Sequence, residues 1–375
     1  MKITCQKTDL VKGVNIVKNA IPVRTTVEIQ KCILIDASAD KITFTANDLE
    51  IGIETVVTGD ILERGIIALD AAEFSKYVAL LPDNEITIET DSRNEAKIMF
   101  NPANPGDCFT LLGKSGESFT KIPDLKKNEP IVVSQFTFKN IIKQTIFSVA
   151  DNENNKLMTG ELLDIKDNKL KVVALDGHRV SIRNVDLKDQ TSNANVIIPK
   201  KTLTKITNII NGTAEDNLFI YPNENDIVFE FDNTIVNSRI IAGEFFQVER
   251  MLSDNYETKV KINRKDMLEV IKRASAIVHE GDKKPIIVNI ENDVMTISIS
   301  SNISSFTNSI EIVKEGKDIM IGFNPKFIRE VIENIDDEEI SLYLLNAKSP
   351  CFIRDDSGSY VYIILPVNFN NPGAN

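Results

Sequence analysis

We expect an α+β fold in which three similar domains, each a duplicated half-unit, are built from helices and antiparallel sheets. Two observations predict it: an apolar helical stripe that returns at a constant period, and alternating apolar and polar stretches between the helices. A chain of 375 residues has room for three domains of ordinary size. We expect them at residues 1–125, 126–253 and 254–375, with linkers near 121–129 and 253–259.

The first helix signal is a set of apolar residues at i, i+4, i+7 and i+11, which places them on one face of an α-helix. The stripe occurs three times, with starting points 128 and 129 residues apart. Thr145 is its one polar member. The three sets are Leu10, Val14, Val17 and Ile21; Phe138, Ile142, Thr145 and Val149; and Met267, Ile271, Ala274 and Val278.

A second helix follows about 64 residues into each repeat, at 69–81, 198–210 and 323–335. Each comes after a short β-branched run and ends at a turn-rich segment. Period-two stretches lie between the helices and predict half-buried strands. They include KITFTAND, EITIET, KLKVVALDG, LFIYP, DVMTISIS and EISLYLL. The sequence therefore predicts six half-units, each with one helix and several antiparallel strands.

Composition excludes several classes of protein. No stretch is apolar enough for a membrane helix, and the N-terminus interrupts any signal peptide with charges, so we expect a cytoplasmic protein. Cys5, Cys32, Cys108 and Cys351 form no CxxC pair, and the chain has only two histidines, so we expect no metal, no cofactor and no catalytic triad. Trp is absent and aromatic residues are 6%, which argues against base stacking with single strands.

Positive charge is concentrated in the predicted helices. The six helical windows sum to +8, which leaves −20 for the rest of a chain whose formal charge is −12. Lysine is a good helix former, so each helix alone is equally well explained by ordinary surface decoration. Six basic helices side by side would instead present one surface to a polyanion, with diffuse phosphate contacts and no sequence reading.

Four segments carry a family likeness: ALDGHRVS at 174–181, GEFF at 243–246, IGFNPKF at 321–327 and ILPV at 364–367. With the threefold repeat, the chain resembles the bacterial DNA polymerase III β subunit family, the sliding clamps, over essentially its full length. The resemblance implies a DNA clamp fold: a head-to-tail homodimeric ring with helices lining the hole and sheets outside. It also implies a non-catalytic processivity factor held on duplex DNA by topology.

The resemblance further implies an apolar peptide-binding cleft between the second and third domains. Without it, Asp176-Gly177 is a turn signal, and a last buried strand is the simpler interpretation of 363–367. Phe246, Val248 and Asn368 depart from the family pattern and leave the peptide preference open. The implied cleft residues are Met158, Leu175, Gly177, His178, Arg179, Val180, Arg250, Met251, Asn324, Phe327, Lys348, Pro350, Ile363, Ile364, Leu365, Pro366, Val367 and Asn368.

For DNA, the resemblance assigns Arg24 and Asn152 to the inner rim, although Glu28 and Gln30 depart from the family there. An exposed loop arginine is an equally simple interpretation of Arg24. The broader candidates for the lining are Lys12, Lys139, Lys143, Lys200, Lys201, Lys205, Lys272 and Arg273. For the dimer interface the matching positions are Phe109, Ile277 and Val278, residue types that are more often plain core.

The implied partners are duplex DNA, a second copy of the chain, the polymerase III catalytic subunit and the clamp loader. Other polymerases and repair proteins would bind through short peptides with Leu and Phe anchors, and no membrane is involved. Three alternatives stay open. Asp176 and His178 could be metal ligands or an acid/base pair. The acidic residues could form a metal-assisted nuclease or phosphotransferase. The chain could also be a monomeric peptide-binding scaffold that never encircles DNA.

Overall fold

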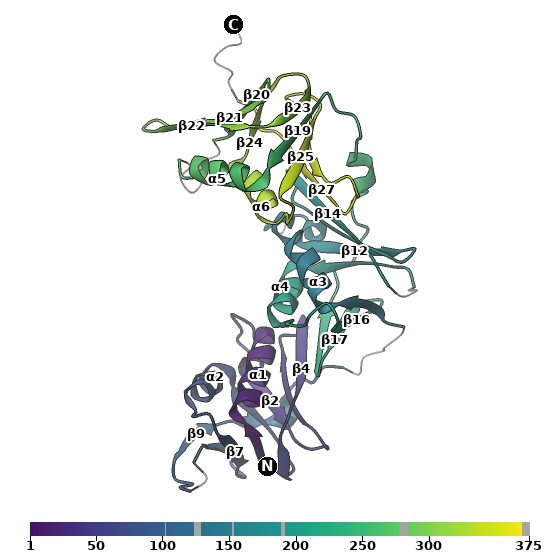
Figure 1. The fold of residues 1–375 in the computed structure, drawn as a ribbon. Helices are drawn as coiled ribbons and strands as arrows, with labels where there is room; N and C mark the ends of the chain where they lie inside the picture. Colours follow the sequence, from purple (N-terminus) through teal and green to yellow (C-terminus); the bar gives the residue numbers. More distant parts are fainter. Residues whose placement is uncertain (102, 124–128, 152–153, 189–191, 278–283, 370–375) are drawn as a thin grey trace. The chain divides into compact units, whose positions relative to one another are not determined.

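The computed structural model describes residues 1–101, 103–123, 129–151, 154–188, 192–277 and 284–369 (Figure 1). These residues repeat one motif six times: a strand, a helix and three further strands. The first half-unit comprises β1 (Lys2–Gln6), α1 (Lys7–Val17), β2 (Cys32–Asp36), β3 (Ile42–Asn47) and β4 (Ile51–Val57). The second comprises β6 (Ile66–Asp70), α2 (Ala71–Leu80), β7 (Glu85–Thr90), β8 (Glu95–Met99) and β9 (Cys108–Leu112).

The next four half-units follow the same order. The third has β11 (Ile131–Ser134), α3 (Gln135–Lys143), β12 (Gly160–Lys166), β13 (Lys169–Leu175) and β14 (Arg179–Asp186). The fourth has β15 (Ala194–Pro199), α4 (Lys200–Ile209), β16 (Asn217–Pro222), β17 (Asp226–Phe231) and β18 (Thr234–Arg239). The fifth has β19 (Thr258–Asn263), α5 (Arg264–Ser275), β20 (Ile286–Glu291), β21 (Val294–Ser300) and β22 (Ser305–Glu311). The sixth has β24 (Ile319–Phe323), α6 (Pro325–Glu333), β25 (Glu339–Leu344), β26 (Cys351–Arg354) and β27 (Tyr360–Ile364).

The chain forms two compact units. The first contains residues 1–138 and 201–240, and the second contains 139–200 and 241–375. Three short strands, β5 (Asp60–Glu63), β10 (Lys114–Ser115) and β23 (Val313–Gly316), add to sheet edges. All strand pairs in the described residues are antiparallel. The predicted α+β class with antiparallel sheets is therefore confirmed.

Each unit contains one nine-stranded sheet that joins two half-units from different repeats. In the first unit β4 pairs with β18, a contact that we name the first joint. In the second unit β14 pairs with β27, the second joint. Each joint brings together the last strands of two half-units. The hydroxyls of Thr55 and Thr234 lie 2.9 Å apart and buried at the first joint, where they hydrogen-bond across the strands.

Two last strands have no such neighbour. β9 is the edge of the five-stranded sheet β5-β1-β7-β8-β9, and β22 is the edge of the four-stranded sheet β22-β21-β20-β24. Both are labelled in Figure 1. An edge strand presents unpaired backbone N–H and C=O groups that can pair with another chain. The last strands of four half-units therefore pair with each other at the two joints, whereas β9 and β22 are last strands that remain sheet edges.

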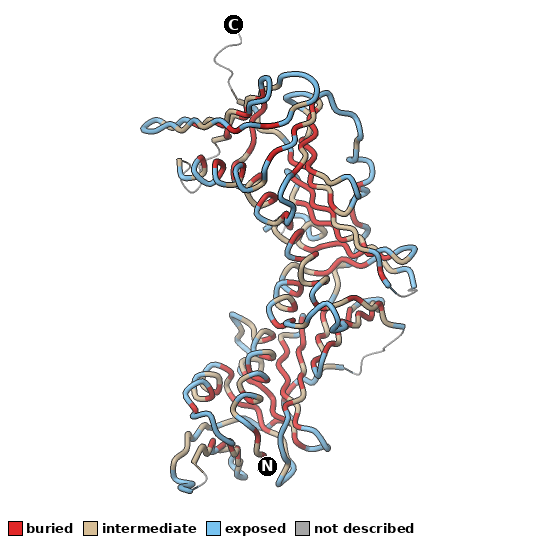
Figure 2. Tube along the Cα trace, viewed as in Figure 1, coloured by how far each residue is buried: buried red, intermediate tan, exposed pale blue. Residues whose placement is uncertain are grey.

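The predicted apolar stripes form the core. In each of the three sets the described members are buried except Ile21, which is half-buried. Thr145 is accommodated because its hydroxyl donates to the carbonyl oxygen of Ile141 at 2.8 Å. Figure 2 shows buried residues alternating along the strands and on the helix faces toward them. The predicted half-buried strands are thus confirmed. The amphipathic helices are confirmed with shorter bounds, because α1 ends at Val17 and α3 at Lys143, before Ile21, Thr145 and Val149. Val278 lies outside the described residues.

Candidate functional site

The β13–β14 turn carries the most distinctive sequence motif. The Oδ1 atom of Asp176 accepts hydrogen bonds from the backbone N–H groups of His178 (3.0 Å) and Arg179 (3.1 Å), and the Asp176 N–H donates to the Arg179 carbonyl. Gly177 has φ +85°, a conformation that residues with a side chain rarely adopt. The Asp-Gly pair is therefore a tight turn, as predicted, with its aspartate committed to the turn.

Arg179 is a buried connector, with a side chain only 4% exposed. Its guanidinium pairs with Asp176 (2.9 Å) and with Glu330 of α6, and it donates to the Phe147 carbonyl. The same group lies 4.6 Å from the Phe327 ring centroid. We expected Arg179 in an accessible cleft, and the structure instead uses it to hold the turn against α6. His178 is exposed and stacks on Phe327, with ring centroids 5.7 Å apart.

An apolar cluster lies beside this turn at the second joint. Leu175, Val180 and Ile363 are buried within it, and Met158 and Phe246 are partly buried against it. Its members were predicted in part from the family likeness. Sequence reasoning missed Phe245, Tyr343 and Phe352, although Phe352 stands directly opposite Ile363 in the β26–β27 ladder. The strand alternation of CFIR and YVYII was the available signal for that pair.

The C-terminal stretch runs past the same turn. The Leu365 N–H donates to the His178 carbonyl at 2.9 Å, and the Val367 N–H donates to the Gly322 carbonyl at 2.8 Å. Leu365 is 40% exposed, whereas Ile364 is fully buried in the core of the third repeat. Ile364 is thus a correction to the predicted cleft set, because strand alternation turns it away from the face that carries Ile363.

The remaining predicted cleft residues are distributed around this cluster. Arg250, Met251, Lys348 and Asn368 are exposed, and Pro350, Pro366 and Val367 are half-buried. The Asn324 side chain accepts from the Lys326 N–H and caps α6, so that residue has a structural task. Of the two departures from the family pattern, Val248 is fully buried, and Phe246 lies edge-on to Phe245. Both departures therefore fill space in the cluster with apolar side chains.

Most of the basic residues predicted to face DNA have acidic partners. Lys201 lies 2.6 Å from Asp48 and 3.0 Å from Glu50, and Lys205 lies 3.8 Å from Asp48. Burial lowers the pKa of Lys205 despite the opposite charge of Asp48. The further pairs are Lys200 with Asp151 (2.7 Å), Lys272 with Glu333 (3.2 Å) and Arg273 with Glu269 (2.8 Å). Asp48, Glu50 and Asp151 lie outside the helical windows and offset part of their charge, whereas Glu269 and Glu333 are already included in the sum of +8.

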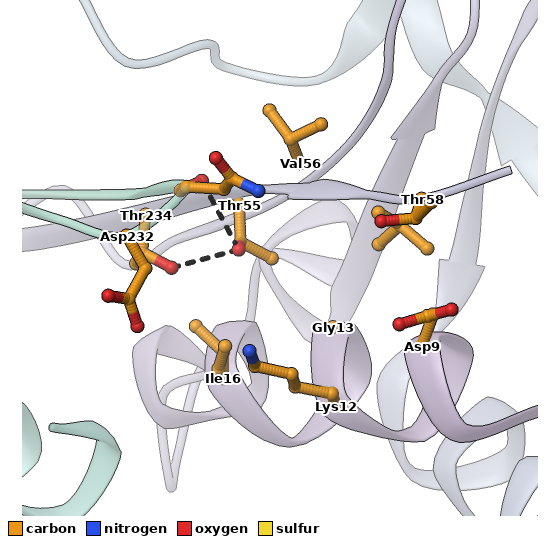
Figure 3. Close-up of a pocket in the computed structure, with 11 residues that line it drawn as sticks. Asp9, Lys12, Gly13, Ile16, Thr55, Val56, Thr58, Asp232 and Thr234 are labelled. Carbon is orange, nitrogen blue, oxygen red and sulfur yellow. Dashed lines mark hydrogen bonds between the residues drawn. The ribbon is translucent and has the colours of Figure 1, made fainter. Parts of the chain in front are cut away.

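The other candidates divide into three groups. Arg24, Lys12 and Lys143 are exposed, and Lys139 is half-buried on α3. Asn152 lies outside the described residues. Lys12 shares a pocket of about 60 Å³ with Asp9 and Asp232 (Figure 3). That volume is far below the roughly 300 to 1,000 Å³ that is usual for ligand sites, so the pocket is too small for a cofactor.

Chemistry-bearing clusters are missing from the part of the chain that the structure describes. No group of three or more His, Cys, Asp or Glu side chains there could hold a metal ion. The four cysteines are free, and burial raises the pKa of the Cys5 and Cys351 thiols to about 12, which keeps them protonated. None of the described helices is long and apolar enough to cross a membrane.

Glu161, on β12, is a fully buried carboxyl group that sequence reasoning did not single out. Neither of its oxygens has a hydrogen-bond partner within the described residues, since the Thr145 hydroxyl donates to backbone carbonyls instead. Burial raises the pKa of Glu161 well above its usual range, and the nearby Thr145 hydroxyl and the charge of Lys200 offset that rise only in part. The folded chain therefore holds this group in its neutral form.

Replacement of Glu161 by Gln should stabilise the protein at neutral pH. A carboxyl whose pKa is raised by folding favours the folded state below its unfolded pKa, and that contribution is lost as pH rises toward the folded value. The glutamine side chain has nearly the same shape as glutamate but does not ionise. We expect the gain in unfolding free energy to be clear at pH 8 and to vanish near pH 4. Urea titrations at both pH values measure it, with the exposed Glu224→Gln as control. An equal effect at both pH values would contradict this account.

A sixfold repeat of strand, helix and three strands, with two filled joints and two open edges, defines a protein of the sliding-clamp class. The chain belongs to the DNA polymerase III β subunit family. The models of its N-terminal, central and C-terminal domains match residues 1–123, 132–247 and 249–368. Because this family is the non-catalytic clamp of the polymerase, the nuclease and phosphotransferase alternatives are not supported.

Individual relatives agree. A solved structure from Eubacterium rectale, described as a putative DNA polymerase III β subunit, is 55% identical. It covers 99% of this chain and all of its own, with a TM-score of 0.94. The Bacillus subtilis sliding clamp structure is 28% identical with a TM-score of 0.93 over 99% of this chain and all of its own. The β sliding clamp of Staphylococcus epidermidis is 29% identical over 98% of this chain and 99% of its own length.

Proposed function

We propose that two copies of this chain close into a ring around duplex DNA and tether the replicative polymerase, in the cytoplasm. The observation that carries the proposal is the pair of open edges, β9 and β22. The ring would contain three kinds of joint: the two described above and a third, in which β9 of one copy pairs with β22 of the other. The proposed domain limits are 1–125, 126–253 and 254–375, supported by the three consecutive family matches.

The turns before the joint strands support the third joint. In each, the backbone N–H of the first residue donates to the carbonyl of the fourth: Asp48 to Ile51, Asp176 to Arg179, and Ser301 to Ser304. The side chain of the first residue also accepts from the N–H of the fourth in all three turns. The third turn precedes β22. This edge therefore begins in the same way as β4 and β14, one strand of each filled joint.

The register follows from this correspondence. At the first joint Ile53 faces Val236, and at the second Ser181 faces Tyr362, all four fully buried. The equivalent positions of the open edges are Phe306 on β22 and Phe109 on β9. Both are only half-buried. Phe109 stacks on Tyr77 with ring centroids 4.8 Å apart, and its strand β9 is the edge of the described sheet. We therefore propose that Phe109 stands opposite Phe306 of the second copy, whose burial would complete the pattern.

Ile277 and Val278, the other candidates for the dimer interface, stay proposals. Ile277 packs against the core of the third repeat, and Val278 lies outside the described residues. For DNA, we retain Arg24, Lys12, Lys139 and Lys143 as candidates for a diffuse phosphate-facing surface. Lys201 and Lys205 are better explained by their pairing with Asp48 at the first joint.

We propose the apolar cluster of the second joint as the site for partner peptides of the polymerase catalytic subunit, the clamp loader, other polymerases and repair proteins. His178, Phe246, Leu365 and Met251 would meet the peptide, while Arg179 would position the turn through Glu330. Exposed or half-exposed apolar side chains around a buried cluster suit anchors of Leu and Phe. Two such sites per ring would let partners exchange without release of the clamp from DNA.

A substitution at Gly177 tests the peptide site. A Cβ at this position meets no atom within 4 Å, so Gly177→Asp would project a charge over the apolar surface rather than disrupt the core. We expect the affinity for a polymerase tail peptide with Leu and Phe anchors to fall about tenfold or more. Gly358→Asp is a matched control, since Gly358 has φ +73° and equally open surroundings. Calorimetric titration measures the affinity. If both variants bound the peptide as tightly as the unmodified chain, the assignment of the peptide site would be wrong.

Small-angle X-ray scattering with inline chromatography tests the ring without any partner. We expect a mass of about 84 kDa, twice the chain mass of 41.9 kDa, and a distance distribution with a hollow centre. A monomer at all working concentrations would leave only the peptide site and favour the scaffold alternative.

A further inference from the structure

The turn after α4 contains the one Asn-Gly pair of the sequence, Asn211-Gly212. In such a pair the backbone nitrogen of the glycine can attack the side-chain carbonyl carbon of the asparagine, because glycine has no side chain to hinder the approach. Ammonia leaves and a five-membered succinimide forms, which water then opens to aspartate or isoaspartate. The chain gains a negative charge, and isoaspartate also lengthens the backbone by a methylene group.

The side chain of Asn211 is open to this attack. It is exposed and lies just past the end of α4, where the chain is no longer helical. Its amide nitrogen donates a long hydrogen bond of 3.4 Å to the Ile209 carbonyl, which holds the side chain weakly. The attacking nitrogen of Gly212 is therefore the point at which the fold can control the reaction.

A buried side chain holds that nitrogen. The Gly212 N–H donates to the Oε1 atom of Gln135 at 3.0 Å. The nitrogen attacks only after it has lost this proton and moved toward Asn211, so the hydrogen bond opposes both steps. Gln135 is fully buried, and its Nε2 atom donates to Asp232 at 3.1 Å and to the Asn217 carbonyl at 3.4 Å. The amide cannot turn away from Gly212 without leaving buried donors unpaired.

Gln135 also fixes the loop that carries the pair. A Cβ atom at Gly212 would lie 2.5 Å from the Cδ atom of Gln135, so only glycine lets the loop approach this closely. The backbone N–H of Gln135 donates to the Asp216 carbonyl at 2.8 Å. The close packing that requires a glycine, and so creates the reactive pair, thus also brings in the group that protects it.

The third repeat shows why a glutamine is needed. Arg264 is the first residue of α5, as Gln135 is of α3, and its N–H donates to the Glu338 carbonyl at 2.9 Å. Its side chain donates to the Asp337 carbonyl at 2.9 Å. An arginine has no acceptor and cannot hold a backbone N–H. Gln135 therefore uses a helix start common to both repeats for a contact that Arg264 cannot make.

We propose that Asn211 is a latent deamidation site, which the Oε1 atom of Gln135 keeps unreacted while the first unit is folded. Deamidation then proceeds only through local opening of the turn after α4, at the unhindered rate multiplied by the open fraction. The product adds a carboxylate to a hollow of about 620 Å³ that Lys12 also lines. A weaker contact with DNA phosphates there would rest on the function proposed for Lys12, whereas the deamidation itself does not.

Peptide mapping by mass spectrometry tests the proposal on the full-length chain. Samples at pH 8 are kept folded or unfolded in guanidinium chloride, and the fraction of acid at position 211 is followed over time. We expect the folded chain to react about tenfold more slowly or less than the unfolded chain, because the open fraction is small. Equal rates in the two samples would overturn the proposal.

Gln135→Met separates the guard from the rest of the fold. Methionine has a similar length but offers only a weak acceptor, so the folded rate should rise about fivefold or more. Gln144→Met is the matched control, because Gln144 is also buried and donates to Asp336 at 2.9 Å, in the second unit. If Gln135→Met reacted no faster than this control, Gln135 would not be the protecting group.

Hydrogen exchange at the Gly212 amide is an independent measurement that needs no variant. We expect this amide to be protected by about the same factor as deamidation, since both require the same opening. It therefore decides the case if Gln135→Met fails to fold. A Gly212 amide that exchanges freely while Asn211 stays unreacted would overturn the role of Gln135.

Discussion

Thr307→Pro on β22 should convert the ring into monomers. At the filled joints His178 pairs with Leu365 and Glu50 with Arg239 through backbone hydrogen bonds, and every second residue of an antiparallel strand bonds to the same neighbour. Thr307 lies four residues after Ile303, which corresponds to His178, so its N–H should point toward the second copy. Proline removes that donor yet is tolerated where the N–H of an edge strand faces outward.

We expect the dimer dissociation constant to rise about a hundredfold, which equals roughly 2.7 kcal/mol. Sedimentation equilibrium over a range of concentrations measures it, and circular dichroism checks that the fold is intact. Thr307→Val is the matched control, because it keeps the β-branch and the backbone donor at the same position. If the proline variant remained as dimeric as the valine variant, the pairing of β9 with β22 would be wrong.

Arg179→Met should have the largest effect on stability. The change leaves the carboxylates of Glu330 and Asp176 without their cation in a site where they are only 22% and 14% exposed. Loss of one partner from a buried ion pair costs about 3 to 5 kcal/mol. For a unit of this size that corresponds to a drop in Tm of roughly 6 to 20 °C. Peptide affinity should fall too, because the turn loses its anchor on α6.

Differential scanning calorimetry compares this variant with Arg273→Met. Arg273 pairs with Glu269, and the two side chains are 56% and 66% exposed, so loss of this pair should cost less than about 1 kcal/mol. If the two variants lost similar amounts of unfolding free energy, Arg179 would contribute no more to stability than a surface ion pair does.

Periodicity predicted the elements well, because helices and strands depend on local spacing that the sequence states directly. The Asp-Gly turn at Asp176 was predicted for the same reason. The pairing of Lys201 with Asp48 was not, since the two residues are far apart in the chain and meet only where β4 joins β18. Arg179 was misjudged because an arginine in a turn is usually exposed, and its burial depends on carboxylates from two elements. Glu161 resembles any strand-face glutamate in the sequence.

Retention on closed circular DNA tests the central claim most directly. The chain is loaded onto a nicked plasmid by a bacterial clamp loader with ATP, separated from free protein by gel filtration, and then treated with a restriction enzyme that cuts the plasmid once. We predict that the protein stays with the circle at high salt and leaves after linearisation, because a topological link needs no fixed contacts. Equal retention on circular and linear DNA, or dissociation from the intact circle in salt, would contradict encirclement.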